Sequence, residues 1–117
     1  MKVIVGNSGK SQITRGLMLQ VGQGGVLILS ETNVRHMFNN FKYCKTTDML
    51  DSITILERKL PPEFLDEIHH VVFITMMVNF DDGIINQLLN LELETGKQFY
   101  LQMNDFRMDH IKVYDMK

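Results

Sequence analysis

Residues 1–18, MKVIVGNSGKSQITRGLM, combine a short apolar run, a glycine-rich turn and the start of an amphipathic segment. The run KVIV at 2–5 is continuous rather than alternating, a pattern typical of a strand that is buried on both faces. Apolar residues then recur at helical spacing between 11 and 22, namely at Ile13, Leu17, Met18 and Val21. The stretch therefore predicts a strand, a tight loop and a helix in direct succession.

The loop in this stretch, GNSGKS at 6–11, matches the second half of a phosphate-binding P-loop. The full pattern is G-x-x-x-x-G-K-[ST]. Gly9, Lys10 and Ser11 fit its end, whereas Ile4 stands at the place of its first glycine. Glycines let the backbone approach a phosphate, and the free N–H groups at a helix start bind anions. We therefore predict a phosphate site with an altered entrance, and an ordinary glycine turn is the alternative. The predicted site consists of Gly6, Asn7, Ser8, Gly9, Lys10, Ser11 and Gln12.

Further apolar runs predict the remaining strands. Continuous runs occur at 26–29 (VLIL), 71–76 (VVFITM) and 99–101 (FYL), and alternating runs occur at 52–56 (SITIL) and 111–114 (IKVY). Alternation is typical of strands with one solvated face, often near the edge of a sheet.

Helical spacing predicts helices between these strands, at 11–22, 33–43, 62–68 and 82–95. Asn33 is a plausible N-cap of the second helix, Pro61 and Pro62 can open the third, and Gly96 can end the fourth. Strands and helices then alternate along the chain, which indicates an α/β fold. We expect three α/β/α layers with a mostly parallel sheet between helices. Ligands of such folds bind beyond the carboxyl ends of the strands.

Size and composition limit the class of protein. The 117 residues suggest a single domain, 1–117. A formal net charge of −2 gives no support to nucleic-acid binding, although binding through a local basic patch is still an option. One cysteine, Cys44, allows no intramolecular disulfide and suggests a reducing, cytoplasmic setting. The apolar run at 71–78 is far shorter than the roughly 18 residues of a membrane span, so we expect no membrane partner.

Polar residues follow the predicted strands where a ligand would bind. Glu31 could orient or deprotonate a water molecule, although by itself it is better interpreted as a solvated acid near a helix start. Thr75 stands where a Walker-type ATPase carries an aspartate. The later Asp81 and Asp82 are better interpreted as N-caps of the helix at 82–95. The next strand ends in Gln102 and Asn104, which could sense a γ-phosphate or could simply be polar residues of the loop that follows.

In its order of elements the chain resembles the compact RecA-like ATPase core of hexameric replicative helicases and recombinases. The segments that carry the resemblance are GNSGKS, GGVLILSE, SITILERKLPPEFLDEI, VVFIT, FYLQMNDFR and MDHIKVYDM. The resemblance implies ATP and Mg²⁺ as ligands, with Lys10 at the β- and γ-phosphates and the Ser11 hydroxyl on the metal. It also implies Glu31 as the catalytic glutamate and Gln102 as the γ-phosphate sensor, and Asp109 matches the acid that leads the closing strand. Because such cores bind ATP between subunits, the resemblance further implies a homo-oligomer.

Three departures from that family shape the expected function. Ile4 alters the P-loop entrance, and Thr75 replaces the Walker B aspartate, so binding is better supported than hydrolysis. We expect a small P-loop ATP-binding protein with weak or partner-dependent ATPase activity, linked to DNA replication, recombination or packaging. The length of the chain is the third departure: it is much shorter than a helicase core, so unwinding activity is not carried over from the resemblance. The alternative is a non-hydrolysing P-loop-fold module that regulates a partner protein. A nucleotide or nucleoside kinase is a third option, for which the short connections leave little room.

Overall fold

A computed structural model describes residues 1–58, 60–77 and 81–117, and within them six strands form one sheet in the order β3-β2-β4-β5-β1-β6. All neighbouring strands are parallel except β6, which runs antiparallel to β1 at one edge. The strands are β1 Lys2–Gly6, β2 Val26–Ser30, β3 Tyr43–Thr46, β4 His70–Ile74, β5 Gln98–Asn104 and β6 Lys112–Asp115. The predicted α/β class and the mostly parallel sheet are therefore confirmed.

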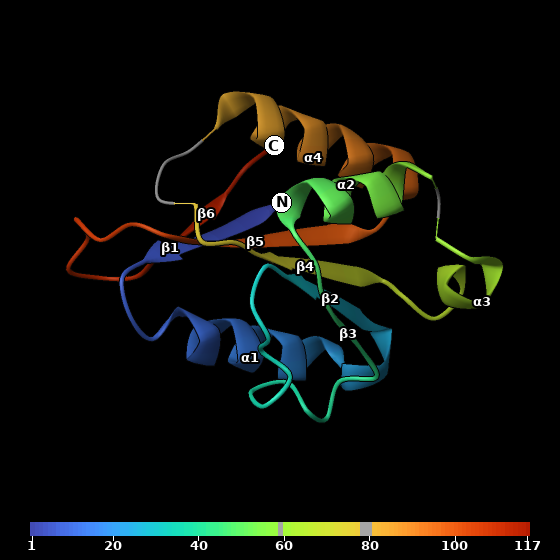
Figure 1. Ribbon diagram of the computed structural model, residues 1–117, viewed down its shortest axis with the longest axis horizontal. Coiled ribbons are helices and arrows are strands. Elements are labelled where there is room, and N and C mark those ends of the chain that lie inside the picture. The colour runs from blue at the N-terminus through green and yellow to red at the C-terminus, as the bar shows by residue number, and fades with distance from the viewer. Residues whose placement is uncertain (59, 78–80) are drawn as a thin grey trace.

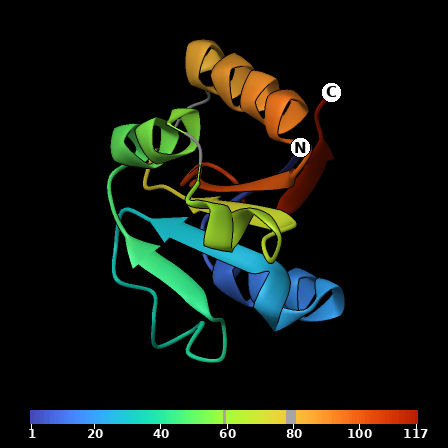
Figure 2. The same cartoon turned by 90° about the vertical axis from the view of Figure 1, so that its right-hand side faces the viewer.

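Helices cover both faces of this sheet. Helix α1 lies on one face, and α2 and α4 lie side by side on the other, as Figures 1 and 2 show. The short helix α3 lies beside the amino end of β4 (Figure 1). The helices are α1 Lys10–Val21, α2 Met49–Glu57, α3 Pro62–Leu65 and α4 Asp82–Thr95, and one 3-10 turn spans Gln23–Gly25.

The continuous apolar runs bury side chains on both faces of the sheet. In β1, Val3 and Val5 belong to the core beneath α2 and α4, whereas Ile4 belongs to the core beneath α1. In β4, Phe73 belongs to the core beneath α2 and α4, and Val72 belongs to the core beneath α1. This arrangement explains why these strands lack the polar–apolar alternation of a half-exposed strand.

The strand predicted at 52–56 is wrong, because this segment lies inside helix α2. Its buried residues are Met49, Ser52, Ile53 and Leu56, a spacing of three and four that belongs to a helix face. Asp48 caps the helix, since its side chain accepts a hydrogen bond of 2.7 Å from the Asp51 N–H. The apparent alternation of SITIL is thus part of a longer helical pattern that begins before it.

The helix predicted at 33–43 is also wrong, because the chain forms turns there. Asn33 accepts a hydrogen bond from the Arg35 N–H in a local turn instead of capping a helix. Val34, Phe38 and Phe41 are nevertheless buried, in the core on the α1 side. Apolar spacing in this segment therefore reflects a loop that packs against the sheet, and the strand β3 that follows it was not predicted.

The other three helices differ from the prediction in small ways or agree with it. Helix α1 buries Lys10, Thr14 and Met18, four residues apart, while the predicted core residues Ile13 and Val21 are exposed. Helix α3 ends before Ile68, which is buried beyond it. Helix α4 keeps the predicted bounds: the Asp81 side chain accepts hydrogen bonds from two backbone N–H groups, and Gly96 ends the helix with φ 68°. The expected N-cap at Asp81 is confirmed, whereas Asp82 is the first residue of the helix.

Candidate functional site

The strand register brings the carboxyl ends of the central strands together at one end of the sheet. Gly6 at the end of β1 pairs with Asn104 of β5, and Ile74 at the end of β4 pairs with Gln102 of β5. A cleft of about 370 Å³ opens at this end, beside the start of α1. Seven of the candidate residues from the sequence line it, namely Asn7, Gly9, Lys10, Ser11, Gln12, Gln102 and Asn104.

The loop conformation depends on two glycines. Gly9 has φ 84° and ψ 2°, a left-handed conformation that glycine adopts without strain, and it is the N-cap of α1. It supplies no side chain, so no side-chain oxygen caps the first N–H groups of the helix. Gly6 does not line the cleft; a Cβ built there would lie 2.9 Å from Cγ1 of Ile111, which packs over the loop. Ser8 is exposed and also lies outside the cleft lining.

Lys10 is the charged residue of the cleft lining, and it is buried, with an exposed fraction of 5%. Its Nζ donates a hydrogen bond of 2.5 Å to the carbonyl oxygen of Asn7, which leaves two of the three ammonium donors for other acceptors. Burial lowers the pKa of Lys10 from its ordinary value of 10.5. A poorly solvated ammonium group beside backbone N–H groups is a favourable environment for an anion.

A chain of side-chain hydrogen bonds fixes the position of the Ser11 hydroxyl. Thr14 Oγ1 donates to Gln102 Oε1 at 2.7 Å, and Gln102 Nε2 donates to Ser11 Oγ at 3.1 Å. Thr14 is fully buried, and Gln102 has an exposed fraction of 5%. The sequence prediction missed Thr14, although a polar residue one helical turn after Lys10, on the same face, was a usable sign.

The carboxylate expected to activate water is bound elsewhere. Glu31 does not line the cleft, and its Oε2 accepts a hydrogen bond of 2.7 Å from the backbone N–H of Met76, the second residue after β4. Thr75 is buried, and its Oγ1 accepts from the backbone N–H of Met77. Within the described part of the chain, the cleft is lined by no carboxylate and by one charged residue, Lys10.

The donor set of the cleft does not fit the Mg²⁺ ion expected at Ser11. Proteins usually hold Mg²⁺ through one or two carboxylates together with the phosphates of the substrate. Here the Ser11 hydroxyl is present, but Glu31 is bound to backbone, and the position after β4 at which the resemblance expects an acid is occupied by Thr75. Across residues 1–58, 60–77 and 81–117, no group of three or more His, Cys, Asp or Glu side chains could hold a metal ion.

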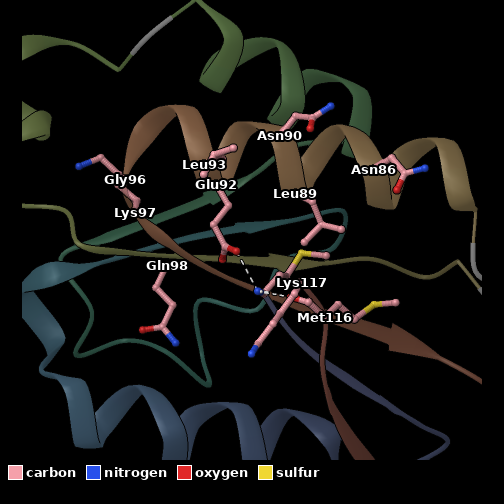
Figure 3. Close-up of a pocket in the computed structure, with 11 residues that line it drawn as sticks. Asn86, Leu89, Asn90, Glu92, Leu93, Gly96, Lys97, Gln98, Met116 and Lys117 are labelled. Atoms are coloured by element: carbon pink, nitrogen blue, oxygen red, sulfur yellow. Dashed lines mark hydrogen bonds and ion pairs between the residues drawn. The ribbon is translucent and has the colours of Figure 1, made fainter.

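A second cavity, of about 910 Å³, lies at the other end of the strands, where the parallel strands begin (Figure 3). Its walls come from α4, the start of β5 and the last two residues, and Glu92 Oε1 within it accepts from the Met1 amino group at 2.8 Å. It contains none of the predicted site residues. This cavity lies at the amino end of β5, whereas ligands of parallel sheets usually bind beyond the carboxyl ends of the strands.

No protein-family model, curated protein or solved structure matches this chain. Among the described helices, none is long and apolar enough to cross a membrane. The assignment of a function therefore rests on the cleft and on the groups that line it.

Proposed function

We propose that the chain binds the phosphate groups of a nucleotide, ATP or another NTP, in the cleft at the start of α1. The observation that carries the proposal is the buried Lys10 ammonium beside a helix start that no side chain caps. The backbone N–H groups of this first turn and the partial positive charge of the helix end both favour an anion. The strand–loop–helix context is the one in which P-loops bind phosphate, which supports the resemblance to RecA-like ATPase cores.

Lys10→Ala tests this proposal in an equilibrium titration with labelled ATP. We expect the variant to lose at least about tenfold in affinity, because the ammonium group is a direct charge-assisted donor to phosphate. Lys2→Ala is a matched control, since Lys2 begins the same strand β1 at the far end of the sheet and forms a partly exposed ion pair with Asp115. Equal binding by wild type and Lys10→Ala, or no binding by either, would contradict the proposal.

Binding without efficient hydrolysis is the second part of the proposal. Activation of an attacking water requires a base within hydrogen-bond reach, directly or through one water. The hydrogen bond between Glu31 and the Met76 N–H occupies the carboxylate that the resemblance assigns to this role. This contact favours the alternative of a P-loop-fold module that does not hydrolyse nucleotide.

A phosphate-release assay separates the two alternatives. We expect turnover near background in wild type, and no further change in Glu31→Gln, because Glu31 bonds to backbone outside the cleft lining. Turnover that Glu31→Gln abolishes would instead support an ATPase, with Glu31 moving into the site when nucleotide binds.

A further inference from the structure

The charge of the cleft matches that of one phosphate group. In the part of the chain that the structure describes, Lys10 supplies the one full charge of the lining. The start of α1 adds a partial charge of about +0.5. A singly esterified phosphate group carries about −1.5 to −2 near neutral pH. A triphosphate carries more negative charge than these groups neutralise, and P-loop sites usually offset that excess with a divalent cation.

The neutral side chains of the cleft are placed as hydrogen-bond donors. Because Ser11 Oγ accepts from Gln102 Nε2, the hydroxyl hydrogen of Ser11 is left to donate to an acceptor in the cleft. Asn104 also lines the cleft, with an exposed fraction of 7%, and its Nδ2 contacts Met76 Sδ at 3.4 Å. A thioether is a weak acceptor, so the Asn104 amide remains available to a stronger one such as a phosphate oxygen.

The cleft lacks a comparable arrangement of oxygen ligands for a divalent cation within the described part of the chain. The acid that the resemblance assigns to this site, Glu31, would have to give up its hydrogen bond to the Met76 N–H before it could bind a metal or its water shell. Ser11 Oγ already uses one of its two lone pairs to accept from Gln102. The lining thus offers an ammonium group, backbone N–H groups and amide donors, which all suit an anion.

We propose that the cleft binds one phosphate group through direct contacts with Lys10, Ser11 and the amides of the loop, without a divalent cation between phosphate and protein. This inference rests on the proposed function and specifies its ligand: a terminal phosphate group, free or carried by a nucleotide. Magnesium is therefore not required for affinity, in contrast to what the P-loop resemblance implies.

Isothermal titration calorimetry with inorganic phosphate, ADP and ATP, each in EDTA and in MgCl₂, tests the inference on the wild-type chain. We expect affinities within about twofold in the two buffers and displacement of ATP by inorganic phosphate, because both use the same donors. A loss of about tenfold or more in EDTA would overturn the inference while leaving phosphate binding in place. If none of the three probes binds in either buffer, the proposed function itself fails and the inference fails with it.

Gln102→Glu provides a second test, because it adds the missing carboxylate beside Ser11 while Thr14 can still donate to it. We expect inorganic phosphate to bind at least about tenfold more weakly to this variant in EDTA, from like-charge repulsion, and MgCl₂ to restore part of the loss. Gln98→Glu is the matched control, since it makes the same change at the exposed opposite end of β5. Wild-type affinity of Gln102→Glu in EDTA would overturn the inference. If circular dichroism shows that this variant does not fold, the wild-type titrations in EDTA and in MgCl₂ still test the inference.

Discussion

At the scale of single residues, the buried hydroxyl of Thr14 holds the polar side of the cleft together. It donates to Gln102 Oε1, whose amide group in turn donates to Ser11. Helix α1 buries this hydroxyl completely, on the same face as Lys10 and Met18. A polar side chain in a core position is stable only when it is hydrogen-bonded, so Thr14 and Gln102 depend on each other.

Thr14→Val should lower the free energy of unfolding by about 1–3 kcal/mol, because it preserves the shape of the side chain but leaves Gln102 Oε1 without its buried donor. Thr14→Ser retains the hydroxyl and should recover a large part of that loss. Guanidinium unfolding followed by circular dichroism measures both variants. A valine variant more stable than the serine variant would show that the Thr14–Gln102 hydrogen bond does not contribute to stability.

The lowered pKa of Lys10 predicts a pH dependence of phosphate binding. Burial disfavours the charged form, so the ammonium group of the free protein loses its proton at a pH below the ordinary 10.5. Affinity for phosphate should therefore fall as pH rises through this lowered pKa. Stability changes in the opposite direction: between the lowered pKa and 10.5 the unfolded chain binds more protons, so stability rises with pH across that window.

Lys10→Arg provides the control, because a guanidinium group stays charged throughout this range. Calorimetric titrations with phosphate at increasing alkaline pH should show a decline in affinity for wild type and a much smaller one for Lys10→Arg. Identical pH profiles for the two proteins would show that another group titrates, and that Lys10 does not supply the charge that binds phosphate.

At the scale of secondary-structure elements, sequence periodicity gave correct strands where apolar runs were continuous and an ambiguous result where they were short. The strands at 2–5 and 26–29 and the helix at 82–95 lie where the pattern predicts them. SITIL fits both a strand and one turn of a helix, and only the capping residue Asp48 with the buried Met49 extends it to a helical pattern. The loop at 33–43 shows that apolar spacing alone does not identify a helix when a segment is buried by packing.

The cap at Asp48 gives a prediction at this scale. Asp48→Ala should destabilise the protein by about 1 kcal/mol, because the Asp51 N–H at the start of α2 loses its side-chain acceptor. Asp48→Asn keeps an acceptor oxygen and should stay close to wild type. Denaturant unfolding midpoints measure the difference, and an alanine variant as stable as the asparagine variant would show that this cap does not stabilise α2.

At the scale of the whole molecule, strand order determines which predicted residues meet. The loop at 6–11 was predictable as a unit, since its residues are consecutive. Its contact with Gln102 depends on β5 lying next to β1, an adjacency that the local pattern of neither strand specifies. The same pairing places Asn104 in the cleft, whereas Met76, the second residue after β4, donates its backbone N–H to the carboxylate of Glu31. Sequence reasoning therefore found most of the lining but not the hydrogen bonds that decide what each group can do.

The claim that phosphate binds in the cleft at the start of α1 can be tested residue by residue. Two-dimensional NMR of the labelled chain during titration with inorganic phosphate reports on each amide group separately. We predict that the largest shift changes occur at Gly9, Lys10, Ser11 and Gln12 at the start of α1 and at the side-chain amide of Gln102, which all line the cleft. Changes confined to the cavity at the other end of the strands, around Leu93 and Gln98, or no changes at saturating phosphate, would contradict the claim.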